Sequence, residues 1–198
     1  NYSNKTNFDK RVNMATETLY DVWARRNPKW EIRFEEIIHQ FTDYGVGSSD
    51  LTSAKGKILG AGYELYIFAF FIGLYENKKR ELTGDSKIFG QPIQFWGNLD
   101  SKRLRKAYPR LREYIFTSLL AKTSDELDLI ALEKGEVSDR KAVDFLINSM
   151  EQYANYGFYF IEEKLESNPN YFYKNTGFLD VILDLVQPGN INEEIEEL

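Results

Sequence analysis

The chain has 198 residues and a net charge of −6, and 42% of its residues are hydrophobic and 15% aromatic. This composition is too apolar for a disordered chain and is sufficient for one sizeable core, so we expect a folded globular protein. The chain contains no cysteine and a single histidine, His39. These two facts exclude disulfides, thiolate metal sites, cysteine nucleophiles and every site that needs two histidines from one chain. We assign no catalytic residue, metal or cofactor from the sequence.

The expected organisation is one helical domain over residues 1–190, followed by an acidic tail, 191–198, with the composition of a disordered segment. The first residues contain no apolar run typical of a signal peptide. The lack of cysteine also fits a reducing compartment. We therefore expect a cytoplasmic protein.

Two amphipathic helices are expected near the start of the chain. Apolar residues recur at three- and four-residue spacing over residues 7–26 and again over 30–44. The pair Asn27-Pro28 should end the first helix, and Gly45 should end the second.

The stretch from Ile58 to Tyr75 is apolar on all sides, and Glu64 is its only charged residue. Such a segment normally becomes a central helix surrounded by other elements. Its length approaches what a bilayer requires. However, it contains Glu64 and three glycines, and the neighbouring amphipathic helices need a buried partner. We therefore expect a core helix over residues 58–76 and no membrane span.

The helical period is lost between residues 82 and 99, and a short β-hairpin or a structured loop is expected near 86–97. A helix should follow over 101–122, in which Pro109 either introduces a kink or begins the second half. Thr123 and Glu126 have the spacing of a capping box that opens a short helix ending at Gly135. Two further helices are expected at 139–166 and 178–186. The predicted fold class is mostly α: a multi-helix bundle around the central helix.

The charges are unevenly distributed along the chain. Residues 1–112 contain 19 Lys and Arg against 13 Asp and Glu, whereas residues 113–198 contain 6 against 18. This division predicts either a basic working surface or two oppositely charged faces in contact. Six cations should occupy one face of the 101–122 helix: Lys102, Arg103, Arg105, Lys106, Arg110 and Arg112. Three more follow the central helix and would be secondary contacts: Lys78, Lys79 and Arg80.

Three functional hypotheses remain open. The first is a noncatalytic accessory protein that binds nucleic acid, with DNA favoured, through this basic helix face, where Phe95, Trp96 and Tyr108 could stack on bases. The second is an interaction or scaffold subunit whose basic and acidic halves meet in a homo-oligomer or a complex with another protein. The third is a metal-dependent enzyme in which several carboxylates converge: Asp125, Glu126, Asp128, Glu162 and Glu163.

Four successive segments also form a recognisable order. They are an apolar helix, GYELYIFAFFIGLY; an aromatic stretch with a Phe-Gly step, SKIFGQPIQFWGN; the helix expected over 101–122; and a helix with a Gly-Phe step, YANYGFYFIEEKL. This order, which covers about half the chain, resembles the DndE family of small bacterial proteins associated with DNA phosphorothioation. The resemblance implies a noncatalytic, DNA-associated accessory protein that self-assembles. It assigns no role to an individual residue.

Overall fold

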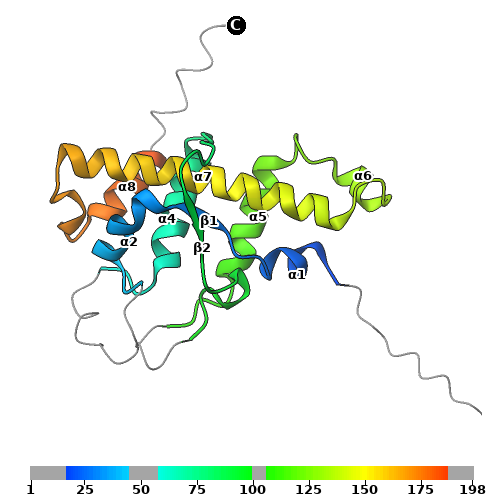
Figure 1. Ribbon diagram of the computed structural model, residues 1–198, viewed down its shortest axis with the longest axis horizontal. Helices are drawn as coiled ribbons and strands as arrows, with labels where there is room; N and C mark the ends of the chain where they lie inside the picture. Colours follow the sequence, from blue (N-terminus) through cyan, green and yellow to red (C-terminus); the bar gives the residue numbers. More distant parts are fainter. Residues whose placement is uncertain (1–16, 45–57, 100–105, 187–198) are drawn as a thin grey trace, which may run out of the picture.

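The computed structural model describes residues 17–44, 58–99 and 106–186. Helices dominate this part of the chain and one two-stranded sheet accompanies them, so the expected mostly α fold is confirmed (Figure 1). The helices and strands are α1 (Leu19–Ala24), β1 (Lys29–Glu31), α2 (Glu35–Phe41), α4 (Gly62–Tyr75), β2 (Ser86–Ile88), α5 (Leu111–Thr123), α6 (Leu129–Glu133), α7 (Asp139–Ser167) and α8 (Gly177–Val186). Short 3-10 turns occur at Ile32–Phe34, Ile93–Phe95 and Tyr171–Tyr173.

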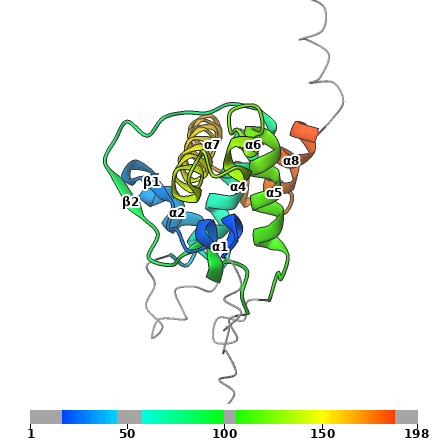
Figure 2. The same cartoon turned by 90° about the vertical axis from the view of Figure 1, so that its right-hand side faces the viewer.

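Helix α4 forms the centre of the bundle, as its apolar sequence predicts. It packs along α7 and also contacts α2 and α8, which lie on either side of it in Figure 2. The helix begins at Gly62, four residues later than expected, because Ala61 has extended backbone. Its 14 residues span about 21 Å, less than the thickness of a bilayer core. No helix in the described ranges is both long and apolar enough to cross a membrane.

The long helix α7 approaches α4 closely because glycines face the partner backbone from both helices. Gly73 of α4 lies against the backbone of Tyr153, and Gly157 of α7 lies against the backbone of Ala69. A side chain at either glycine would occupy space that the other helix already fills. The two glycines therefore set the distance at which the two central helices pack.

The sheet joins two segments that are distant in the sequence. β1 and β2 are antiparallel, and Trp30 is paired with Lys87. Segment 86–97 is thus a structured loop, because its strand pairs with residues before α2 rather than folding back on itself. The helix expected over 30–44 is wrong in its first residues: Trp30 and Glu31 belong to β1, and helical backbone begins with the turn at Ile32–Phe34. Trp30 is buried against the rings of Tyr44 and Phe89, so tertiary packing overrides the helical pattern there.

The helix expected over 101–122 is also corrected. Residues 106–108 are not helical, Pro109 and Arg110 form a turn, and α5 begins at Leu111. Proline disfavours helical backbone in the residue before it, which explains why the helix starts after Pro109 instead of passing through it. The basic helix face is therefore not formed over residues 106–110. The remaining part of the expected helix, 101–105, lies outside the described residues.

The other helices agree with the sequence in type and approximate position. Ser138 caps α7, and Gly135, with φ of 74°, follows α6. Helix α6 starts later than the Thr123 spacing predicts, because Asp128 supplies the cap by accepting the Ala131 N–H at 2.8 Å. Helix α1 ends before Asn27-Pro28, as expected, and the first part of the helix expected over 7–26 falls outside the described ranges.

Candidate nucleic-acid interface

The nine cations that the sequence singles out fall into three groups. Lys102, Arg103 and Arg105 lie outside the described residues. Lys78, Lys79, Arg80 and Arg112 contact other groups of the protein. Lys106 and Arg110 are exposed and precede α5. The structure therefore separates cations with a structural role from cations that are free to meet a ligand.

The run Lys78, Lys79 and Arg80 follows α4 and lies along α7. Lys79 forms an ion pair with Glu126. The Arg80 guanidinium carbon lies 3.3 Å from the centre of the Tyr159 ring. These contacts are cation–π and charge pairs within the chain, so they already use the groups that were expected to contact phosphate.

Lys78 is held in a similar way. Its Nζ lies 3.1 Å from Glu76 Oε2 and 5.6 Å from the centre of the Tyr156 ring. The hydrogen bond to Glu76, together with Tyr156, raises the pKa of Lys78. The charge of Lys78 is thus balanced locally.

Arg112 connects α5 to the loop that follows β2. Its Nη1 donates to the backbone carbonyl of Trp96 at 2.8 Å and to Asn98 Oδ1 at 2.9 Å. Trp96 itself is fully buried and stacks on Tyr63, with ring centres 5.5 Å apart. Trp96 is therefore a core residue and is not available to stack on a base, contrary to the expectation from sequence.

The segment from Lys106 to Arg110 is exposed but anchored. The backbone N–H of Tyr108 donates to the carbonyl of Gly97 at 2.7 Å, which fixes the middle of the segment against the preceding loop. The Tyr108 side chain is 55% exposed. The side chains of Lys106 and Arg110 form no ion pair or hydrogen bond with another described residue. Two free cations thus flank a free aromatic ring, and Phe95, 43% exposed, is a second accessible ring in the neighbouring loop.

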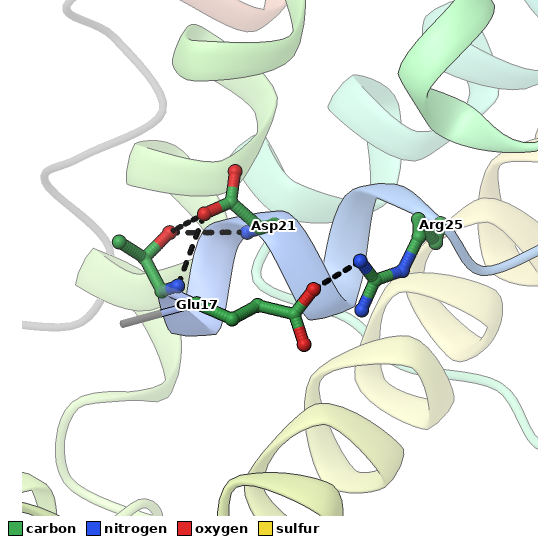
Figure 3. Close-up of polar contacts among 4 residues, drawn as sticks. Glu17, Asp21 and Arg25 are labelled. Atoms are coloured by element: carbon green, nitrogen blue, oxygen red, sulfur yellow. Dashed lines mark hydrogen bonds and ion pairs between the residues drawn. The ribbon is translucent and has the colours of Figure 1, made fainter. Parts of the chain in front are cut away.

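A polar pocket of about 380 Å³ lies beside this region, between α1 and Arg112. Figure 3 shows three of its charged residues: Glu17 forms an ion pair with Arg25, and Asp21 closes the capping box of α1 with Thr18. Asp21 Oδ2 accepts hydrogen bonds from the Thr18 backbone N–H at 3.0 Å and from its hydroxyl at 2.6 Å. The Thr18 contacts lower the pKa of Asp21, and the hydrogen bond from Arg25 lowers the pKa of Glu17. Both carboxylates therefore remain ionised and stabilise the region of α1. Neither has the raised pKa that a general acid needs.

A buried carboxylate that the sequence did not reveal lies at Glu31 in β1, where only 1% of the residue is exposed. It accepts hydrogen bonds from the Thr83 backbone N–H at 2.9 Å, from Asn155 Nδ2 at 3.1 Å and from the Tyr159 hydroxyl at 3.0 Å. Burial acts to raise the pKa of Glu31, but these donors outweigh it and the pKa is lowered. Glu31 is thus an ionised structural centre that joins β1, α7 and the segment before β2.

The carboxylates proposed for a metal-dependent enzyme do not converge. Three of them lie close to α6, before the first residue of α7: Asp125, Glu126 and Asp128. The other two, Glu162 and Glu163, lie near the far end of α7, a helix of 29 residues (Figure 1). Across the part of the chain that the structure describes, no group of three or more His, Cys, Asp or Glu residues is arranged to hold a metal ion. Glu162 instead pairs with Arg33 at 2.8 Å. The arrangement needed for the third hypothesis is absent from these residues.

No family model matches the chain, and no curated protein or solved structure matches it either.

Proposed function

We propose that the protein is a noncatalytic accessory protein that binds nucleic acid through the basic segment 102–110. The observation that carries the proposal is the difference between its cations. Lys78, Lys79, Arg80 and Arg112 are held by carboxylates, rings or carbonyls of the chain, whereas Lys106 and Arg110 are exposed and unpaired among the described residues. Lys102, Arg103 and Arg105 adjoin them directly in the sequence.

Exposed cations without a partner, as Lys106 and Arg110 are among the described residues, suit contact with phosphates. Binding of lysine and arginine to phosphates releases counterions from the nucleic acid, and this provides affinity that does not depend on base sequence. Tyr108 adds an exposed ring between Lys106 and Arg110, and such a ring can stack on an unpaired base or pack on a sugar. In the described part of the segment, residues 106–110, the backbone is not helical and Tyr108 is bound to Gly97, so the proposed surface differs from the helix face that the sequence predicted.

DNA is the favoured nucleic acid, and a DNA modification or defence system is the favoured setting. Both choices depend on the resemblance to the DndE family. The observations on Lys106, Tyr108 and Arg110 support a phosphate-bearing polymer in general.

The alternative, an interaction subunit whose basic and acidic halves meet between chains, has less support from the charges. The two halves already pair within one chain, since Arg26 contacts Asp144 at 2.5 Å and Lys79 contacts Glu126. These charges are no longer free to attract a second subunit.

Charge reversal tests the proposal. We expect Lys106→Glu combined with Arg110→Glu to weaken binding of a fluorescently labelled duplex by about tenfold or more at low ionic strength, measured by anisotropy. The matched control is Arg140→Glu combined with Lys141→Glu, which reverses two exposed cations at the start of α7. Equal losses in the two double variants would contradict the assignment to segment 102–110, because they would indicate a response to net charge alone.

A further inference from the structure

One side of α4 is only partly covered, although the helix is apolar all round. An open pocket of about 430 Å³ lies between α4 and α8. The residues of α4 that line it recur at three- and four-residue spacing and form one stripe: Glu64, Ile67, Phe68, Phe71 and Tyr75. Leu59, Phe178 and Ile182 complete the lining. This size and this mainly apolar lining are typical of a site that receives a ligand or a partner's side chain.

The apolar surface continues from the pocket onto α8. Leu179, Leu183 and Val186 are 54%, 46% and 47% exposed. At about 100° per residue, these three side chains occupy the side of α8 next to Phe178 and Ile182. Tyr75 at the other edge of the pocket is 53% exposed. A continuous apolar strip of this kind is typical of an interaction surface, whereas single exposed apolar residues need no explanation.

Glu64 is the one charged residue among the described residues that line the pocket. Glu64 Oε2 accepts the backbone N–H of Gly60 at 2.8 Å. Its other oxygen, Oε1, has no hydrogen bond or ion pair with any residue in the described ranges. No lysine or arginine in the described ranges lines the pocket, and α8 carries none. An occupant that is apolar and also carries a positive charge would therefore complement this site.

Two other occupants fit the charge less well. Residues 187–198, which follow α8, contain four glutamates and no lysine or arginine, so they would bring like charge to Glu64. A second copy that docked by the same face in a symmetric dimer would place Glu64 on both sides of one interface. Both arrangements oppose negative charge to negative charge.

We propose that the pocket between α4 and α8 binds an amphipathic helix of a partner protein. A bulky apolar side chain of that helix enters the pocket, its apolar stripe lies along Leu179, Leu183 and Val186, and its lysine or arginine pairs with Glu64. A helix suits the site because its apolar residues at three- and four-residue spacing match a groove between two helices. This proposal does not depend on nucleic-acid binding, because it uses none of the residues of segment 102–110.

Two synthetic peptides of about 16 residues, long enough to follow α8 along its length, test the proposal on the whole chain. Both carry leucine and phenylalanine on one helical face; one has lysines on the other face and the control peptide has glutamates. We expect the basic peptide to bind in a fluorescence-anisotropy titration and the acidic peptide to bind at least about tenfold more weakly. Failure of the basic peptide to bind, or equal binding of the two peptides, would overturn the proposal.

Two substitutions locate the binding site. Glu64→Gln keeps an acceptor for the Gly60 N–H but removes the charge, and we expect it to weaken the basic peptide by about tenfold. Ile182→Trp fills the pocket from a partly exposed position and should weaken the same peptide by a similar factor. The control is Glu133→Gln, which removes an exposed charge on α6, at the opposite end of the molecule from α8 (Figure 1).

Unchanged binding in both pocket variants, or an equal loss in Glu133→Gln, would place the peptide elsewhere and reject the site. Sedimentation of the whole chain provides the remaining test. A dimer that Glu64→Gln or Ile182→Trp dissociates would reject a partner protein in favour of a second copy. Duplex binding should be unaffected by both pocket variants, so failure of this proposal remains distinguishable from failure of the proposed function.

Discussion

Gly157 of α7 lies so close to Ala69 of α4 that a Cβ atom on Gly157 would come within 1.9 Å of the Ala69 carbonyl oxygen. The reciprocal contact occurs at Gly73, where a Cβ atom would come within 2.2 Å of the Tyr153 carbonyl oxygen. Neither carbonyl belongs to a flexible side chain, so the helices themselves would have to separate. The packing of the two central helices therefore depends on the absence of side chains at two positions.

Replacement of Gly157 by alanine should destabilise the fold. Alanine favours a helix by about 1 kcal/mol over glycine, but the clash with Ala69 costs more, and we expect the free energy of unfolding to fall by about 2 kcal/mol or more. Urea denaturation followed by circular dichroism measures this difference. Gly90→Ala is the control, since no atom of the described residues lies within 4 Å of a Cβ atom there. Equal unfolding midpoints for Gly157→Ala and the unsubstituted chain would show that the helices are not in close contact.

Acid should lower the free energy of unfolding, in part because Glu31 becomes protonated. Because hydrogen bonds hold the folded-state pKa of Glu31 below the unfolded value of 4.5, its contribution to stability is complete above that value and is lost as the pH falls through the folded-state pKa. We expect Glu31→Gln to lower the free energy of unfolding by about 1–3 kcal/mol at neutral pH. Below pH 4.5 the difference between Glu31→Gln and the unsubstituted chain should shrink.

Glu17→Gln is the matched control for Glu31. The pKa of Glu17 is also lowered, by its hydrogen bond from Arg25, but Glu17 lies on the surface. Exposed pairs contribute little to stability, so its loss should change the pH profile only slightly. A Glu31→Gln profile that runs parallel to that of the unsubstituted chain at every pH would contradict the role of Glu31 as an ionised centre.

Arg112 should behave as a structural residue. Arg112→Gln removes the donors to the Trp96 carbonyl and to Asn98, and we expect a loss of about 1 kcal/mol in stability and faster amide exchange around residues 96–98. Its effect on duplex affinity should be smaller than that of Lys106→Gln. If Arg112→Gln weakens duplex binding more than Lys106→Gln does and leaves stability unchanged, Arg112 belongs to the binding surface instead.

The parts of the fold that depend on local signals could be predicted from the sequence. The spacing of apolar residues and the Ser138 cap predict α7 almost to the residue, and the apolar run predicts α4 as the core. β1 could not be predicted, because its pairing with Lys87 and the burial of Trp30 arise from contacts distant in the sequence. Tertiary contacts of this kind override local propensity.

The candidate site was predictable in composition but not in geometry. Clustering of cations before α5 is visible in the sequence, whereas Pro109 prevents the single helix that would have aligned them. Charge alone also does not reveal that Lys79 pairs with Glu126, or that Arg80 lies on Tyr159. Glu31 gave no signal, since its donors come from Thr83, Asn155 and Tyr159, far along the chain.

The most direct test of the central claim is the affinity of the whole chain for a labelled duplex as a function of salt concentration. For binding through phosphates, we expect the logarithm of the binding constant to fall linearly with the logarithm of salt concentration, and Lys106→Gln with Arg110→Gln to reduce the slope by about 2. Absence of binding at the lowest salt concentration, or a slope that the double variant leaves unchanged, would contradict nucleic-acid binding through segment 102–110.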